Sequence, residues 1–363
     1  MIKPPDDHSP DMQIEGTVLA GREFEPIEAR VVIEDGTIAA IEEVETDSTS
    51  VILPAFVNAH THLGDSIAKE AGAGLSLDEL VAPPDGLKHR LLRAADRATK
   101  VDAMARSIRF MERTGTAAFV EFREGGVEGV SMIEDALADR HAEGVIMGRE
   151  TEAALSVADG FGASGARDGN FATIREAARA AGKPFAIHAG ERDDEDIDPA
   201  LDLDPDFVVH MVYAREHHLE RLDAEGTPVV VCPRSNLVTN VGTPPIADID
   251  AHTTVAIGTD NAMTNSPSMF REMEFAAKLS DLPATTILRM ATTNGASIAG
   301  LNCGLIEQGR EARLLVLDGD SDNLCYAKDL PRAIVRRAGM GDVERVLFGE
   351  AGERPDGTSS GDR

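Results

Sequence analysis

Two histidines near the start of this sequence, His60 and His62, have the side-chain type and spacing of metal ligands. They end the stretch VILPAFVNAHTH, which begins at Val51. Alternate side chains of a β-strand project from the same face, so these imidazoles would point together. Histidine is the commonest nitrogen ligand of zinc, and two converging rings could hold one cation. An isolated H-x-H pair is weak evidence, and later segments decide its interpretation.

Three further candidates follow apolar segments elsewhere in the chain. His188 ends FAIH, His210 ends FVVH, and Asp260 follows VAIGT. Each of them alone could be an ordinary core or turn residue. In a barrel of parallel strands, however, the carboxyl ends of all strands open at one mouth. Candidates at equivalent strand ends therefore predict one convergent site.

The elements that would position these residues alternate between strands and helices. Strands are expected at 51–62, 115–122, 144–149, 153–157, 184–191, 206–211, 228–233 and 253–260. Helices are expected at 96–113, 130–141, 171–181, 214–225, 269–280 and 284–301. This alternation predicts an α/β fold, a closed (β/α)8 TIM-like barrel. An open doubly wound sheet is the alternative, but no G-x-G-x-x-G follows the first strand.

Short strands at both chain ends predict a second, smaller unit. Asp35-Gly36 lies between two alternating apolar runs, which is a strong hairpin signal. The segments GREARLLVLDGD and AIVRRAGMGDVERVLFGE resemble this opening unit. We therefore expect residues 1–52 and 302–350 to form one small β-sandwich beside a barrel of residues 53–301. Residues 1–11 look loosely structured, and the polar, Gly/Ser-rich residues 351–363 are predicted to be a disordered tail.

The composition indicates the solvent and compartment more than the reaction. The chain has 35 basic and 64 acidic residues, a formal charge of −29. Such a surface is typical of halophilic proteins and would repel nucleic acid and anionic membranes. The sequence contains no apolar run long enough for a membrane span and no secretory h-region. Its three cysteines form no CxxC, so a cytoplasmic protein is expected. A homodimer is expected from base rates alone.

Five motifs in order give the sequence a family resemblance. PAFVNAHTHLGD, FAIHAGE, FVVHM, VCPRSNL and IGTDNAM resemble the amidohydrolase superfamily, in the branch of cytosine deaminases, adenosylhomocysteine deaminases and triazine hydrolases. The resemblance spans about residues 13–350. It implies the metal ligands His60, His62, His188 and Asp260. It also implies that Glu191 is a proton shuttle and that His210 contacts the bound water or the substrate.

The chemistry of these residues agrees with the implied roles. Three neutral imidazoles and one carboxylate leave a divalent metal an open position for water, whose pKa falls toward about 7. Asp260 can take the proton of that water. Glu191 can protonate a ring nitrogen and then the departing amine, if partial burial raises its pKa.

The lysine positions predict the number of metal ions. Binuclear relatives use a carbamylated lysine on the fourth strand, but no lysine lies between Lys100 and Lys183. One divalent metal per chain is therefore expected. Zinc is the first choice, and ferrous iron is the alternative.

Two loops are candidates for substrate binding. Lys88 and His89 follow a Pro-Pro-Asp-Gly turn, and a basic pair in so acidic a protein could bind a phosphate or carboxylate. A plain helix N-terminus is the alternative. Asn236, after the seventh strand, is the best amide candidate. Weaker candidates end other predicted strands: Arg123, Glu124 and Arg149.

The sequence therefore predicts a metal-dependent aminohydrolase, an enzyme that hydrolyses non-peptide carbon–nitrogen bonds. It would remove an exocyclic amine from a small heterocycle (a pyrimidine, purine, pterin or triazine) and release ammonia. One alternative is a cyclic amide hydrolase or chlorohydrolase acting on a related ring. The other is a catalytically idle barrel that binds a small molecule.

Overall fold

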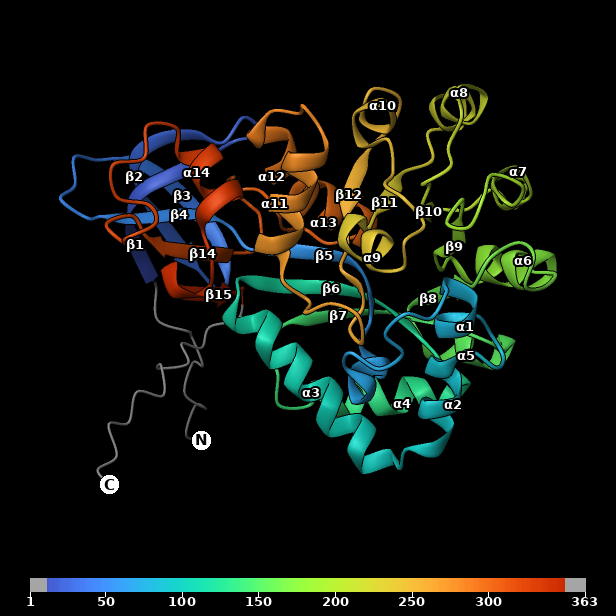
Figure 1. Ribbon diagram of the computed structural model, residues 1–363. Coiled ribbons are helices and arrows are strands. Elements are labelled where there is room, and N and C mark those ends of the chain that lie inside the picture. Colours follow the sequence, from blue (N-terminus) through green and yellow to red (C-terminus); the bar gives the residue numbers. More distant parts are fainter. Residues whose placement is uncertain (1–11, 350–363) are drawn as a thin grey trace.

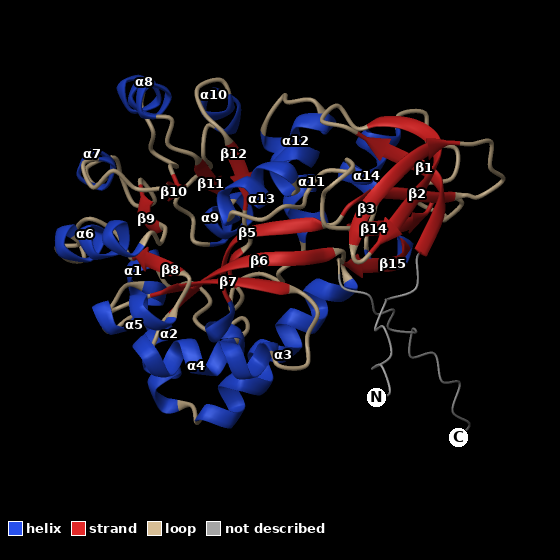
Figure 2. Ribbon diagram, turned by 180° about the vertical axis from the view of Figure 1, so that it is seen from behind, coloured by secondary structure: helices blue, strands red, loops and turns tan. Residues whose placement is uncertain are grey.

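A parallel barrel and a smaller sheet at its side make up the computed structural model, which describes residues 12–349 (Figures 1 and 2). This architecture confirms the predicted fold class. The loosely structured start predicted at 1–11 and the tail predicted at 351–363 lie outside the described residues.

The barrel sheet is parallel throughout, and its strands follow one another in chain order. They are β5 (Phe56–His62), β6 (Thr116–Arg123), β7 (Glu143–Gly148), β8 (Gly160–Ala163), β9 (Phe185–Ala189), β10 (Phe207–His210), β11 (Val229–Val231), β12 (Val255–Ile257) and β13 (Asp260–Asn261). β12 pairs with β11, whereas β13 pairs with β5. The two short strands thus share the eighth position and close the barrel. Between them, Thr259 N–H donates to His60 O.

The fourth strand is not where the sequence pattern placed it. Residues 153–157 lie in helix α5 (Glu152–Val157), which Thr151 caps by accepting from Ala154 N–H. The strand is β8, whose residues are GFGA. A Cβ at Gly160 would lie 2.6 Å from Met147 Sδ, and one at Gly162 would lie 2.6 Å from the Phe122 ring. Close packing requires these glycines, and they remove the apolar pattern that identifies a strand.

Helices surround the barrel close to their predicted positions (Figure 1). They include α3 (Arg97–Arg113), α4 (Gly126–Leu137), α6 (Ala172–Ala181), α8 (Glu216–Glu225) and α11 (Met269–Leu279). The predicted last helix is two helices, α12 (Ala284–Ala291) and α13 (Thr293–Ala299), because Thr292 leaves helical geometry with φ −131° and ψ −89°.

Shorter helices occupy the connections between barrel elements. They are η1 (Leu63–Ala68), α1 (Leu77–Val81), α2 (Leu87–Ala94), α7 (Ile197–Leu201), α9 (Pro233–Val238) and α10 (Ile246–Asp250). Within residues 12–349, no helix combines the length and apolar character needed to cross a bilayer.

The smaller sheet joins the two ends of the chain. Its strands are β1 (Met12–Ala20), β2 (Glu25–Glu34), β3 (Thr37–Glu43), β4 (Ser50–Pro54), β14 (Arg313–Asp318) and β15 (Val343–Phe348), in the order β15-β14-β4-β1-β2-β3. Helix α14 (Leu330–Arg337) and the short η2 (Met340–Asp342) precede β15. The predicted hairpin turns at Asp35 and Gly36, with φ 47° and 70°. Ile38 N–H donates to Arg310 O, so the β3 edge meets the segment entering β14 and the sheet curls around its own core.

The apolar stretch that begins at Val51 is two strands, not one. β4 pairs with β1 and β14 in the smaller sheet, whereas β5 pairs with β6 in the barrel. At the junction, Ala55 N–H donates to Arg313 O and Phe56 N–H donates to Gly115 O. This buried junction anchors the strand that carries His60 and His62.

Candidate active site

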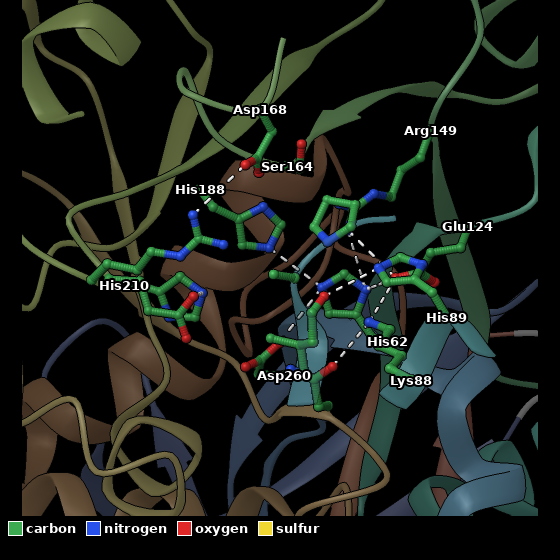
Figure 3. Close-up of a pocket in the computed structure, with 16 residues that line it drawn as sticks. His62, Lys88, His89, Glu124, Arg149, Ser164, Asp168, His188, His210 and Asp260 are labelled. Carbon is green, nitrogen blue, oxygen red and sulfur yellow. Dashed lines mark hydrogen bonds and ion pairs between the residues drawn. The ribbon is translucent and has the colours of Figure 1, made fainter. Parts of the chain in front are cut away.

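The predicted residues meet at the barrel mouth, where the carboxyl ends of the strands converge. His60 and His62 lie on β5, His188 on β9 and His210 on β10, and Asp260 begins β13. Figure 3 shows four of them around one cavity. The ligand atoms of His60, His62 and His188 lie within 4.8 Å of one another, as do those of His60, His210 and Asp260.

Three imidazoles present ring nitrogens to a common centre. His62 Nε2 lies 3.3 Å from His188 Nε2. Asp260 Oδ1 lies 3.3 Å from His60 Nε2 and 3.6 Å from His62 Nε2. On the outer side, His62 Nδ1 lies 3.0 Å from Phe122 O and His188 Nδ1 lies 2.8 Å from Ala163 O. Because carbonyls only accept, each Nδ1 carries the proton and each Nε2 lone pair faces the centre.

Unsatisfied buried atoms at this centre fit a metal ion. Both ring nitrogens of His60 and Oδ1 of Asp260 are buried without a hydrogen-bond partner. Buried polar atoms are nearly always satisfied. One divalent cation bound by three imidazoles and a carboxylate would satisfy His60 Nε2 and Asp260 Oδ1, and both ligand types are common for zinc.

The electrostatics keep these ligands in their metal-binding protonation states. Burial lowers the pKa of His60, lowers that of His188 well below its usual range, and lowers that of His62 to about 3. Burial alone would raise the pKa of Asp260, but the close approach of His60 Nε2, at 3.3 Å, and the nearby imidazoles hold it well below its ordinary value. Neutral imidazoles and an ionised carboxylate are therefore expected at neutral pH.

The backbone at Asp260 is held in an uncommon conformation. Its φ is 55°, in the left-handed region, and His210 has φ 83°. Non-glycine residues seldom adopt this region, and those that do cluster at functional sites. Asn58 secures the segment, because its Nδ2 donates to Thr259 Oγ1 at 2.7 Å and its Oδ1 accepts from Thr259 N–H at 3.0 Å. This pair ties the start of β13 to β5.

Glu191 lies at the cavity, unlike its acidic neighbours. Its side chain is 17% exposed and its Oε2 lies 3.6 Å from His210 Nε2. Burial raises its pKa. Glu195 in the same acidic run is 82% exposed. Glu191 therefore lines the cavity while Glu195 is solvated, but Asp196 of the same run is buried and accepts from Gly190 N–H at 2.8 Å.

The cavity is small, with a volume of about 50 Å³, and is lined mostly by polar residues. Its wall includes Glu124 and Arg149, which the sequence analysis named as weaker candidates. It also includes residues that the sequence analysis missed, namely Ser164, Asp168 and Arg192. Ser164 and Asp168 follow β8, the strand whose position was predicted wrongly, so no strand-end signal identified them.

The three predicted substrate-binding residues are placed differently from one another. Lys88 and His89 line the cavity, but Lys88 Nζ is already 2.7 Å from Glu124 Oε1 and 2.9 Å from Asn261 Oδ1. Asn236 is fully buried, and its Nδ2 donates to His210 Nδ1 at 3.1 Å. It therefore lies behind His210. Substrate contact by these residues remains a prediction.

A buried ion pair positions α9 beside the predicted metal ligands. Arg234 pairs with Glu272 of α11, which also accepts from Arg234 N–H at 3.0 Å. The next residue, Ser235, donates from Oγ to Asp260 Oδ2 at 2.6 Å. This hydrogen bond occupies one carboxylate oxygen and leaves Oδ1 toward the centre.

Glu272→Gln is expected to destabilise the fold by about 3 kcal/mol, because it leaves the Arg234 guanidinium buried without a counter-charge. Chemical denaturation in high salt would measure the free energy of unfolding. Glu274→Gln on the same helix is the control, since Glu274 pairs with exposed Lys278 and should cost under about 0.5 kcal/mol. Equal effects of the two variants would contradict a structural role for the buried pair.

Comparison with known proteins gives consistent matches over most of the chain. The amidohydrolase family model matches residues 51–349. A putative aminohydrolase of Archaeoglobus fulgidus is 39% identical over 306 residues, covering 82% of this chain and 86% of the relative. A 5-methylthioadenosine/S-adenosylhomocysteine deaminase of Halobacterium salinarum is 30% identical over 396 residues, covering 93% of this chain and 88% of the relative. The fold is similar to that of an adenosine deaminase from Xanthomonas campestris with bound zinc, at a TM-score of 0.77 and 20% identity. The match covers 94% of this chain and 92% of that structure.

Proposed function

The chain belongs to the amidohydrolase family, and we propose that it is a metal-dependent hydrolytic deaminase of an aminated nitrogen heterocycle. The observation that carries the proposal is Glu191, a carboxyl of raised pKa in the same cavity as a convergent set of three imidazoles and a carboxylate. Relatives named as deaminases of adenosine derivatives make an aminopurine the first substrate class to test. Aminated pyrimidines, pterins and triazines follow.

The metal would be held by His60, His62, His188 and Asp260, with zinc as first choice and ferrous iron as the alternative. A divalent metal at such a site polarises a bound water and lowers its pKa toward about 7. Asp260, ionised and with Oδ1 directed to the centre, can accept a proton there. Ser235 holds the other oxygen and fixes the orientation of the carboxylate.

Glu191 and His210 would act on the substrate side of the cavity. Because burial raises its pKa, Glu191 can carry a proton to a ring nitrogen and a second one to the departing amine. Asn236 donates to His210 Nδ1, so the neutral imidazole carries its proton on Nε2. That Nε2–H can donate to an oxygen that gains negative charge in the reaction.

Metal content and ammonia release test this function together. Protein purified in high salt is expected to contain one zinc or iron per chain and to release ammonia from one class of aminated ring. Chelation should abolish ammonia release and lower the melting temperature, because a metal present at about 100 times its Kd stabilises the fold by about 2.7 kcal/mol. Adding zinc back should restore both.

Two outcomes would overturn parts of the proposal. A bound metal without ammonia from any substrate, but with products of ring opening or dehalogenation, would replace the deaminase with a related hydrolase. Absence of stoichiometric metal after reconstitution would remove the metal site and favour a barrel that only binds a small molecule.

A further inference from the structure

Lys88 belongs to a buried polar network on one side of the cavity. Its side chain is 4% exposed, and Nζ lies 2.7 Å from Glu124 Oε1 and 3.7 Å from Asp65 Oδ2. Nζ also donates to Asn261 Oδ1 at 2.9 Å. Lysine is almost never fully buried unless it is paired, and here one amide oxygen and two carboxylates surround the ammonium. A substrate anion would have to displace one of them and approach two carboxylates.

The same carboxylate that pairs with Lys88 reaches a predicted metal ligand. Glu124 Oε1 lies 2.8 Å from His62 Nδ1, and Phe122 O lies 3.0 Å from that nitrogen. The Phe122 carbonyl only accepts, and the Glu124 carboxylate favours an N–H beside it, so Nδ1 carries the proton and the lone pair is on Nε2. Figure 3 shows Lys88, Glu124 and His62 together on the side of the cavity opposite His210.

The partners of Lys88 come from separate parts of the barrel. Lys88 lies on α2, Glu124 directly follows β6, and Asn261 is on β13 directly after the predicted ligand Asp260. One ammonium thus links the helix beside the cavity to the ends of two strands. Loss of its charge would leave Glu124 without its closest counter-charge, since Arg149 Nη1 lies farther away, at 3.5 Å.

We propose that Lys88 is a positioning residue for the metal site and not an anion-binding residue. It holds Glu124 against Nδ1 of His62 and so keeps Nε2 of His62 directed at the metal. Groups that hold the outer nitrogen of a metal-bound histidine typically change metal affinity about 10- to 100-fold when mutated. The inference rests on the proposed metal site.

Zinc affinity, measured by competition with a chromophoric chelator, tests this role without any substrate. Lys88→Gln and Lys88→Met are each expected to weaken zinc binding by roughly tenfold. Arg90→Gln is the matched control, because Arg90 is exposed on the same helix and should leave the affinity unchanged. If Lys88→Met does not fold, Lys88→Gln decides the result, because its amide still donates.

A double-mutant cycle separates this role from a general loss of structure. Glu124→Gln alone should also weaken zinc binding, and adding Lys88→Met to it should cause little further loss, because both act through one contact. Additive losses, or wild-type zinc affinity in folded Lys88→Gln, would overturn the proposal.

Failure of this inference can be told apart from failure of the proposed function. Wild-type protein that binds no zinc would remove the metal site itself. Wild-type protein that binds zinc and releases ammonia, with a Lys88→Gln variant that changes only KM, would make Lys88 a substrate contact instead.

Discussion

Glu191→Gln is expected to lower kcat for ammonia release by about 10³-fold, because a lost general acid–base group typically costs 10²- to 10⁴-fold. Gln retains the shape and hydrogen-bonding capacity of the side chain but cannot deliver a proton. Zinc stoichiometry should not change, since Glu191 is not among the proposed ligands. The measurement is steady-state ammonia release on the substrate class found first, together with metal analysis of the same preparation.

The fold of this variant should be at least as stable as wild type at neutral pH. Burial raises the pKa of Glu191 in the folded chain above its ordinary value of 4.5, so the native state binds that proton more tightly than the unfolded state. Ionisation therefore costs stability as pH rises from 4.5 through the raised pKa. Gln removes this cost.

Glu195→Gln, at an exposed position of the same acidic run, is the matched control and should leave kcat unchanged. If Glu191→Gln keeps more than about a tenth of the wild-type rate, its loss of activity is smaller than that expected for a lost acid–base group. That result would reject the proton-shuttle assignment.

Asp260→Asn is expected to have the largest effect, a loss of about 10⁴-fold in activity together with weaker zinc binding. The amide cannot accept the proton and carries no charge to neutralise the metal. It also removes the carboxylate oxygen that lies 3.3 Å from His60 Nε2. Zinc content by mass spectrometry and ammonia release would be measured together, in high salt and with added zinc.

Ser235→Ala distinguishes the charge of Asp260 from its orientation. This variant removes the donor to Oδ2 but leaves the carboxylate, so its expected loss is about tenfold, well short of that of Asp260→Asn. If Asp260→Asn kept both zinc and most of its activity, the carboxylate would be neither ligand nor proton acceptor.

The parts of the fold that could be predicted are those with a local pattern. Helices α3 and α6 and strand β10 have clear apolar periodicity, so their positions differ little from the predicted ranges. β8 lacks that signal because Met147 and Phe122, from other strands, leave no room for side chains at Gly160 and Gly162. The split between β4 and β5 depends on hydrogen bonds to Arg313 and Gly115, which are remote in sequence.

The sequence by itself determined which residue types stand at the strand ends. His60, His62, His188 and Asp260 follow apolar segments that must be parallel strands, and parallel strands bring their carboxyl ends to one mouth. Only the tertiary structure decided how each polar group is paired. Lys88 forms an ion pair with Glu124, and Asn236 donates a hydrogen bond to the Nδ1 atom of His210. Burial and hydrogen-bond partners supplied by other strands set these interactions and the resulting pKa values, and no local pattern in the chain encodes them.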